Sequence, residues 1–102
     1  MEFEWDKNKA KENIKRHEDI TFEEAFTVFY DDFAIEKYDK AHSDSDERRF
    51  VRIGYSTKRL LWVCYTIRKD ENGNEVIRII SARKADSEER ELYLDGRRLG
   101  KI

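Results

Sequence analysis

The sequence predicts an α+β fold in which two N-terminal helices pack on an antiparallel sheet and a short helix ends the chain. Three observations indicate this class: two helical patterns near the N-terminus, three strong strand patterns in the second half, and one helical pattern after them. A chain of 102 residues supports one modest core and leaves no room for a second domain. We therefore expect a single domain over residues 1–102, with one face of the sheet partly open.

A short strand and two helices are expected in the first third of the chain. Residues 3–5 alternate like a strand, and Asp6 is suited to cap a helix over residues 7–17. Thr21 and Glu24 then have the spacing of a capping box, which predicts a second helix start. The apolar stripe of this second helix consists of Phe22, Ala25, Phe26 and Phe29. Such a wide stripe predicts a helix that faces the core.

Four further strands should follow the helices. Their patterns cover residues 33–38, 50–55, 60–68 and 75–83. The last three should form an antiparallel meander, because Asn72-Gly73 is a strong hairpin signal before the final strand. The polar stretch 39–47 is expected to be a mobile loop.

A short helix should end the fold. Asp86 and Glu89 have capping-box spacing, so we expect a helix that runs to about Leu94 and is closed by Gly96. The predicted element order is therefore β-α-α-β-β-β-β-α. The lone Cys64 lies in a strand pattern and cannot form an internal disulfide, so we assign it to the core.

Charge is unevenly distributed along the chain. The net charge is −2, but residues 48–69 hold seven bases and no acid, whereas residues 18–47 hold eleven acids and two lysines. Basic segments that meet in space would attract an anion, although the simpler interpretation is that basic and acidic segments neutralise one another. The longest apolar run, residues 60–65, is too short to span a bilayer and the N-terminus has no signal pattern, so we expect a cytoplasmic protein.

The last predicted strand carries cations. Strict alternation would place Ile77, Ile79, Ser81 and Arg83 on one face, and Val76, Arg78, Ile80 and Ala82 on the other. An arginine would then stand on each face of the sheet. Because unpaired buried charge is costly, these side chains suggest a ligand that bears phosphate.

Motifs along most of the chain match a known family in order and spacing. They are Phe3–Asp6, Lys9, Asn13, His17, Phe22–Ala25, Phe29, Arg49–Gly54, Arg78–Ala85, Glu89 and Tyr93. Together they resemble the BrnT family of type II toxin proteins. Two departures are visible, since Arg16-His17-Glu18 replaces the usual Lys-His-Gly, and Asp31-Asp32 lacks the proline that often follows the second helix.

The resemblance implies a small RelE-like ribonuclease that arrests growth by cutting RNA without a metal or other cofactor. It also implies a cognate antitoxin that holds the toxin inactive. The antitoxin of such pairs binds DNA and represses its own operon, with the toxin as co-repressor in a hetero-oligomer of toxin and antitoxin dimers. The toxin itself would therefore meet DNA only through its partner, and no membrane is involved.

The chemistry of RNA cleavage suggests which residues act. RNA carries its own nucleophile, the 2′-OH, so an enzyme needs a base, an acid and cations that stabilise charge on the phosphorus. Arg52, Arg78 and Arg83 lie on strands that we expect to be neighbours, where their guanidinium groups would converge on a phosphate. Alternatively, Arg78 pairs with a helix acid and Arg52 lies flat over the sheet. An antitoxin is expected to cover Arg52 and Arg83, or a nearby part of the sheet.

Histidine is the obvious candidate for proton transfer, because imidazole titrates near neutrality. His17 ends the first helix, where it either acts in catalysis or caps the last carbonyls; His42, in the polar loop, is a weaker candidate. Lys9, Ser81 and Lys84 are expected to contact RNA, although Ser81 suits a tight packing position equally well.

Other function classes fit less well. The alternative is a non-catalytic module whose basic face binds the acidic surface of a protein partner. A binder of double-stranded DNA would need a basic recognition helix, which the sequence lacks. No compact group of His, Asp and Glu suggests a catalytic metal.

Overall fold

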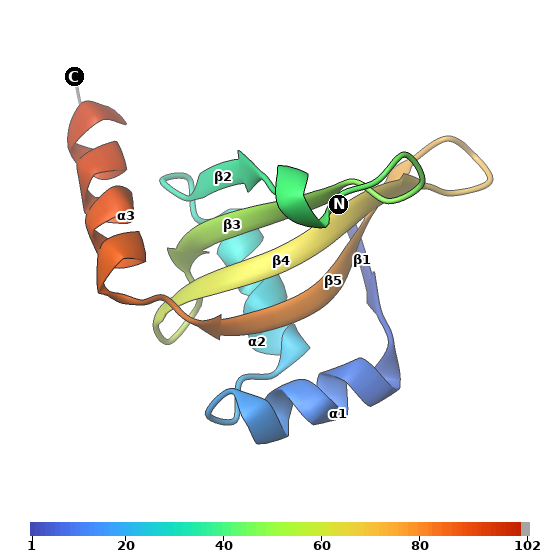
Figure 1. The fold of residues 1–102 in the computed structure, drawn as a ribbon, viewed down its shortest axis with the longest axis horizontal. Coiled ribbons are helices and arrows are strands. Elements are labelled where there is room, and N and C mark those ends of the chain that lie inside the picture. The colour runs from blue at the N-terminus through green and yellow to red at the C-terminus, as the bar shows by residue number, and fades with distance from the viewer. Residues whose placement is uncertain (101–102) are drawn as a thin grey trace.

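A computed structural model describes the backbone of residues 1–100 and the side chains of residues 1–96. Its strands are β1 (Glu2–Trp5), β2 (Ile35–Tyr38), β3 (Arg49–Tyr55), β4 (Leu60–Lys69) and β5 (Glu75–Lys84). Its α-helices are α1 (Lys7–Arg16), α2 (Phe22–Phe26) and α3 (Ser87–Gly100), and its 3-10 helices are η1 (Thr27–Tyr30) and η2 (Lys40–His42). The predicted α+β class and element order are confirmed (Figure 1). In the described part of the chain, no helix combines the length and apolarity that a membrane crossing requires.

The five strands form one mixed sheet in the order β1-β5-β4-β3-β2. The strands from β2 to β5 are antiparallel neighbours, but β1 pairs in parallel with β5, from Glu2 opposite Val76 to Trp5 opposite Ile79. The expectation of a wholly antiparallel sheet was therefore wrong. Parallel pairing needs no tight turn, so a first and a last strand that meet leave no local sequence signal.

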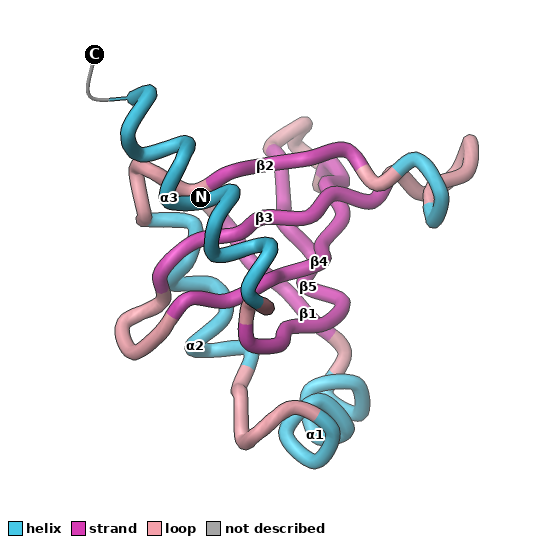
Figure 2. The backbone as a smooth tube through the Cα atoms, turned by 60° about the vertical axis from the view of Figure 1, so that its left-hand side comes forward, coloured by secondary structure: helices cyan, strands magenta, loops and turns pink. Residues whose placement is uncertain are grey.

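Helices cover the two faces of the sheet unequally. On one face α2 and η1, with α1 beside them, bury a large core; its members include Ile20, Phe22, Val28, Phe29, Leu61, Val63, Tyr65, Ile77 and Ile79. On the other face α3 packs only over the end of the sheet (Figure 2). There Tyr93 forms a buried cluster with Val51, Ile53 and Leu60. We call the first face the covered face and the second the open face.

The predicted helix starts are confirmed at atomic level. Asp6 Oδ1 accepts from Asn8 N at 2.7 Å, and Thr21 Oγ1 accepts from Glu24 N at 3.0 Å. The box at α3 is complete, because Glu89 N donates to Asp86 Oδ1 at 2.8 Å and Asp86 N donates to Glu89 Oε1 at 2.9 Å. Local hydrogen bonds of this kind need only short sequence spacing, which explains why they were predictable.

The third helix does not end where the sequence suggested. It continues through Gly96 to Gly100. Gly96 serves packing instead, since a Cβ at this position would lie 3.3 Å from Ile35 Cδ1. The prediction that Gly96 closes the helix was therefore wrong, because the glycine allows α3 to approach β2.

A bulge in β5 changes which residues share a face. Cys64 pairs with Ser81 but the next residue, Tyr65, pairs with Ile79, so Ile80 is an extra residue. Beyond it the alternation shifts by one, and Ala82 joins the covered-face core. Ser81 and Arg83 therefore lie on the open face. The predicted grouping of Ile77 and Ile79 with Ser81 and Arg83 was wrong.

A buried side chain completes the edge of β5 where β1 ends. Asn13, on α1, donates from Nδ2 to Ala82 O at 2.9 Å and accepts from Ala82 N at 3.0 Å, as a neighbouring strand would. Its Nδ2 also donates to Ile20 O at 3.0 Å. One amide thus holds α1 and the following loop against the sheet.

Candidate active site

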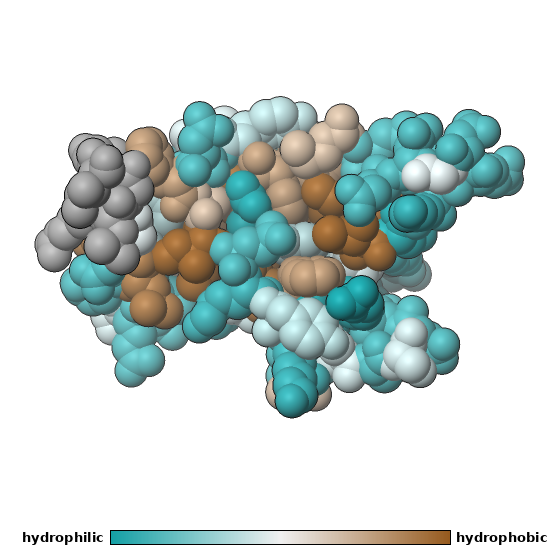
Figure 3. Space-filling model, turned by 90° about the horizontal axis from the view of Figure 1, so that it is seen from above, coloured by the Kyte–Doolittle hydropathy of each residue, from teal (hydrophilic) through white to brown (hydrophobic). Residues whose placement is uncertain are grey.

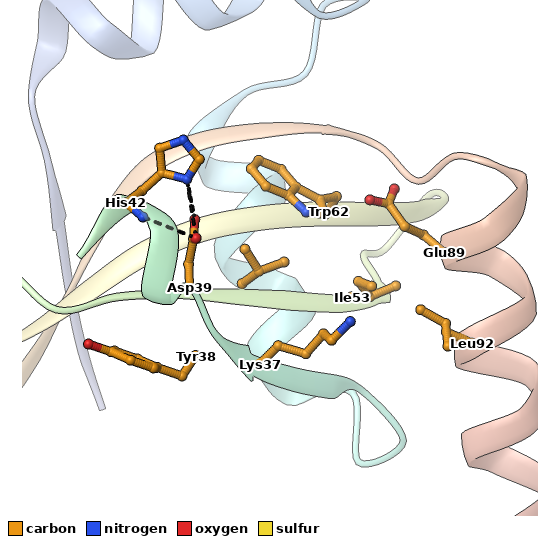
Figure 4. Close-up of a pocket in the computed structure, with 9 residues that line it drawn as sticks. Lys37, Tyr38, Asp39, His42, Ile53, Trp62, Glu89 and Leu92 are labelled. Carbon is orange, nitrogen blue, oxygen red and sulfur yellow. Dashed lines mark hydrogen bonds and ion pairs between the residues drawn. The ribbon is translucent and has the colours of Figure 1, made fainter.

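A hollow of about 300 Å³ lies on the open face beside α3. Its floor is apolar, with Val51, Ile53 and Leu92, and its polar rim consists of Lys37, Asp39, His42, Trp62 and Glu89 (Figure 4). Figure 3 shows hydrophobic surface in the middle of the molecule, crossed and surrounded by hydrophilic side chains. Apolar walls with a few converging polar groups are typical of ligand sites.

Arg83 contacts two residues that line this hollow, Trp62 and Glu89, and these contacts hold it in a fixed orientation. Its guanidinium lies over Trp62, with Cζ 4.3 Å from the ring centroid, and donates from Nη1 and Nη2 to the Glu89 carboxylate at 2.8 Å each. A further bond runs from Nη1 to Lys84 O at 3.2 Å. Register explains the position, because Arg83 stands directly opposite Trp62 on the neighbouring strand.

One edge of the Arg83 guanidinium has N–H donors that the contacts above do not use. Guanidinium has five N–H groups, and the contacts above use three of them. Among the described residues, Nε–H and the adjacent second N–H of Nη2 have no acceptor. These two hydrogens form the second fork of an arginine, which fits two oxygens of a phosphate.

The ion pair of Arg83 and Glu89 is charged at neutral pH. Burial raises the pKa of Glu89, but hydrogen bonds from the Arg83 guanidinium and the Asp86 N–H lower it further, so the pKa lies below its ordinary value of 4.5. The same carboxylate raises the pKa of Arg83. Glu89 therefore stays ionised, and the guanidinium keeps its position.

Arg52 does not share this surface. It lies on the covered face, where Nη1 donates to Glu36 Oε2 at 2.9 Å and Cζ is 5.2 Å from the Phe29 ring centroid. Its other nitrogens approach the carbonyl oxygens of Val28 and Asp31. The alternative for Arg52, a residue lying flat over the sheet, is the one that the structure supports. β3 and β5 are separated by β4, and Arg52 and Arg83 point to opposite faces.

Arg78 shares the open face but not the hollow. Its Nη1 is 3.8 Å from Glu4 Oε1 on β1, and Glu4 is also bonded to Arg68. Five residues separate Arg78 from Arg83 along β5, roughly 15 Å at the usual rise per residue. The predicted convergence of Arg52, Arg78 and Arg83 was therefore wrong.

His17 lies at a second, smaller hollow of about 180 Å³ between α1 and β5. Lys9, Arg16 and Ser81 line the same hollow. The structure therefore brings together Lys9, His17 and Ser81, which the sequence analysis named as separate candidates. The C-cap position of His17 is also observed, with its backbone N–H donating to Asn13 O at 2.9 Å. Lys84 points away from both hollows and forms an exposed ion pair with Glu18 at 3.1 Å.

The sequence analysis missed most of the polar rim of the larger hollow. Trp62 carried no signal beyond its strand pattern, and Glu89 was recognised only as a helix cap. The spacing of Arg83 and Glu89, across a predicted helix start, was the one available hint of their pairing.

Cys64 is buried, as expected, and burial raises the pKa of its thiol to about 11. Within the described side chains, no three His, Cys, Asp or Glu residues gather as metal ligands.

Comparison with known protein families places the chain beside a described family. A family model described as "Ribonuclease toxin, BrnT, of type II toxin-antitoxin system" matches residues 5–89. The matched segment includes Trp62, Arg83 and Glu89. No curated protein matches the chain.

Proposed function

This chain belongs to the BrnT family of ribonuclease toxins of type II toxin-antitoxin systems, and from that premise we propose that it cuts RNA at the open-face hollow beside Arg83. Membership of a type II toxin family implies an RNA substrate and a cognate antitoxin. The cut is endonucleolytic and requires no metal ion. Growth arrest follows from the loss of translatable RNA.

The observation that carries this proposal is the state of Arg83. Glu89 and Trp62 fix the guanidinium, while one fork of two N–H donors stays available for phosphate. A donor that is oriented before the substrate arrives stabilises developing negative charge without the cost of reorganisation. Trp62 and the apolar floor next to it suit the flat face of a nucleobase.

The reaction uses the substrate's own 2′-OH as nucleophile. Attack on phosphorus forms the 2′-O–P bond as the bond from phosphorus to the 5′-oxygen breaks, and charge gathers on the phosphoryl oxygens that Arg83 contacts. The products are a 2′,3′-cyclic phosphate and a free 5′-OH. Lys9, His17 and Ser81 line the neighbouring hollow, where they bind the RNA backbone on its way to the cut.

Cleavage of single-stranded RNA in EDTA tests the proposal. The wild type should cut and leave cyclic phosphate ends, and Arg83→Ala should lower the rate about 10²- to 10³-fold, the usual loss for one donor to a transition state. Arg83→Lys keeps the charge without the fork, so it should recover only part of the rate. If EDTA abolishes cleavage, or Arg83→Ala cuts like the wild type, the proposal fails; loss of cleavage in EDTA would favour a metal-dependent enzyme.

Arg52→Ala is the matched control. It removes an arginine of similar partner number from the opposite face, so cleavage per folded molecule should stay within about twofold. The lost contacts to Val28, Asp31 and Glu36 cost about 1 kcal/mol of stability. Thermal melting of both variants separates folding from chemistry. A large fall in cleavage for folded Arg52→Ala would show that Arg52 contributes to the reaction.

The cognate antitoxin should block the same hollow. We place its inhibitory contact on the open face, where an acidic side chain would take the phosphate fork of Arg83; Arg52, on the other face, would stay uncovered. A DNA-binding part of the antitoxin would then bring the toxin to the operon as co-repressor. In arginine-directed labelling, the antitoxin should protect Arg83 from modification and leave the labelling of Arg52 unchanged. Equal labelling of Arg83 with and without antitoxin would contradict this contact.

A further inference from the structure

The wall of the hollow that faces Trp62 carries a histidine held by an aspartate. Asp39 directly follows β2, and its carboxylate accepts from His42 Nδ1 at 3.0 Å to Oδ2 and 3.2 Å to Oδ1 (Figure 4). It also accepts weakly from the His42 backbone N–H, at 3.3 Å. Both residues line the same hollow as Trp62 and Glu89.

The backbone around this pair is anchored to the sheet. Asp39 N donates to Arg49 O at 2.8 Å. Ser43 Oγ donates to Asp39 O at 2.6 Å and accepts from Arg49 N at 2.8 Å. The segment 39–47, expected to be a mobile loop, therefore contains the helical turn η2 and has hydrogen bonds to β3 on both sides of His42.

The hydrogen bond to Asp39 selects one form of the imidazole. A carboxylate only accepts, so Nδ1 carries the proton and Nε2 of the neutral ring has a free lone pair. The ring is also open to solvent, with 69% of the His42 side chain exposed. An imidazole oriented by a carboxylate through one nitrogen and open at the other is the arrangement that enzymes use for general bases.

We propose that His42 Nε2 is the general base of the ribonuclease reaction and that Asp39 is its positioning residue. This inference rests on the function proposed above. His42 removes the 2′-OH proton as the 2′-O–P bond forms and the bond from phosphorus to the 5′-oxygen breaks. The departing 5′-oxygen takes a proton from water, and His42 later returns its proton to water, so the enzyme is unchanged.

This assignment differs from the histidine that the sequence favoured. His17 lines the other hollow, with Lys9 and Ser81, and caps α1. His42 instead shares its hollow with Glu89, the residue that fixes Arg83. A base in the hollow beside the Arg83–Glu89 pair is placed to act on a phosphodiester that Arg83 binds.

Two substitutions at His42 separate chemistry from structure. Asparagine places an amide N–H near the position of Nδ1, so His42→Asn keeps a donor for Asp39 but cannot transfer a proton; His42→Ala loses both. We expect each variant to lower single-turnover RNA cleavage about 10²- to 10⁴-fold, with little change in the RNA concentration needed for half-maximal rate. If His42 only holds η2 in place, His42→Asn should cleave like the wild type, and the inference is overturned.

The dependence of the rate on pH gives a second readout. The charged and titratable groups that face His42 are Asp39, Lys37, Tyr38 and Glu89, with Arg83 behind Glu89. Because a protonated imidazole cannot accept the 2′-OH proton, the wild-type rate should fall on the acidic side of its pH profile. Both His42 variants should lose this acidic limb, and a limb that persists in them would overturn the assignment.

Controls distinguish the possible failures. Lys58→Ala removes one exposed cation from the turn between β3 and β4 and should cleave like the wild type. If the wild type cuts RNA in EDTA and Arg83→Ala does not, while both His42 variants cut normally, only the present inference fails. If the wild type itself does not cut, the function proposed above fails first. Melting curves for each variant confirm that the measured rates belong to folded protein.

Discussion

Two arginine-glutamate pairs in this molecule have nearly the same geometry and different surroundings. On the open face Arg83 meets Glu89, and on the covered face Arg59 meets Glu24, with a shortest separation of 2.8 Å in each pair. Arg83 gives the two terminal nitrogens to its partner, whereas Arg59 gives Nε at 3.1 Å and Nη2 at 2.8 Å. The fork that stays open in Arg83 is the one that Arg59 uses.

The difference shows that pairing alone does not decide whether an arginine is structural. Glu24 also accepts from Ser56 Oγ at 2.7 Å, and the pair ties α2 to the turn between β3 and β4. Arg59 is not among the residues that line the larger hollow. Arg83 instead has an aromatic ring below it and an open cavity beside its partner. We infer that the first pair stabilises the fold and the second prepares a binding site.

Breaking each pair at the glutamate gives the largest expected contrast. Glu24→Ala leaves Arg59 and Ser56 without their acceptor at a buried position and should cost about 3 kcal/mol, which lowers the melting temperature by roughly 15 °C. We discount the usual cost of a fully buried pair because 29% of the Arg59 side chain is exposed. Cleavage by the folded fraction should not change.

Glu89→Ala should show the opposite balance. It removes one helix cap and one partly exposed pair, about 1 kcal/mol, but it frees Arg83 to move, so cleavage should fall by about tenfold or more. Melting curves and single-turnover rates measured on both variants provide the comparison. Equal effects on stability and on rate in the two variants would remove the distinction between a structural and a functional pair.

Acid should weaken both pairs in the same direction. Burial raises the pKa of Glu24, but hydrogen bonds from Arg59 and Ser56 lower it further, so the pKa lies below the ordinary 4.5, as that of Glu89 does. The unfolded chain therefore binds more protons than the folded one in this range. The stabilisation is fully present above 4.5 and is lost as the pH falls through the folded values. Urea unfolding from pH 7 to pH 3 should show this loss, and Glu24→Ala should flatten it.

The smallest effect is expected at Lys84, the sequence neighbour of Arg83. Its ion pair with Glu18 is exposed, so Lys84→Ala should change stability by less than about 0.5 kcal/mol. Because the side chain points away from the hollow, RNA cleavage should fall by about twofold at most, and the change should vanish at high salt. A loss as large as that of Arg83→Ala would mean that charge near the strand end matters more than orientation.

The fold was largely predictable because its signals are local. Helix caps at Asp6, Thr21 and Asp86 and the hairpin at Gly73, whose φ of +81° suits glycine, each depend on a few adjacent residues. The partner of β1 depends on residues more than seventy positions apart and was not predictable. Gly96 was misjudged for the same reason, since its contact with Ile35 joins distant elements.

The site was less predictable than the fold. Strand alternation correctly identified cations on β5, but the extra residue Ile80 reverses the pattern, and no local motif announces a bulge. The bond between His42 and Asp39 was not predicted, because a polar segment predicts a loop without showing what its side chains contact. This bond has a helical spacing of three residues, which is visible only once η2 is known.

The two hydrogen bonds between Asn13 and the backbone of Ala82 also affect how this chain behaves in a concentrated protein solution. Unpaired strand borders recruit strands from other molecules and start aggregation. Because one side-chain amide occupies both backbone groups of Ala82, a foreign strand cannot dock there without displacing α1. Asn13, which attaches α1 to the sheet, thus also prevents strands of other molecules from pairing with this part of β5.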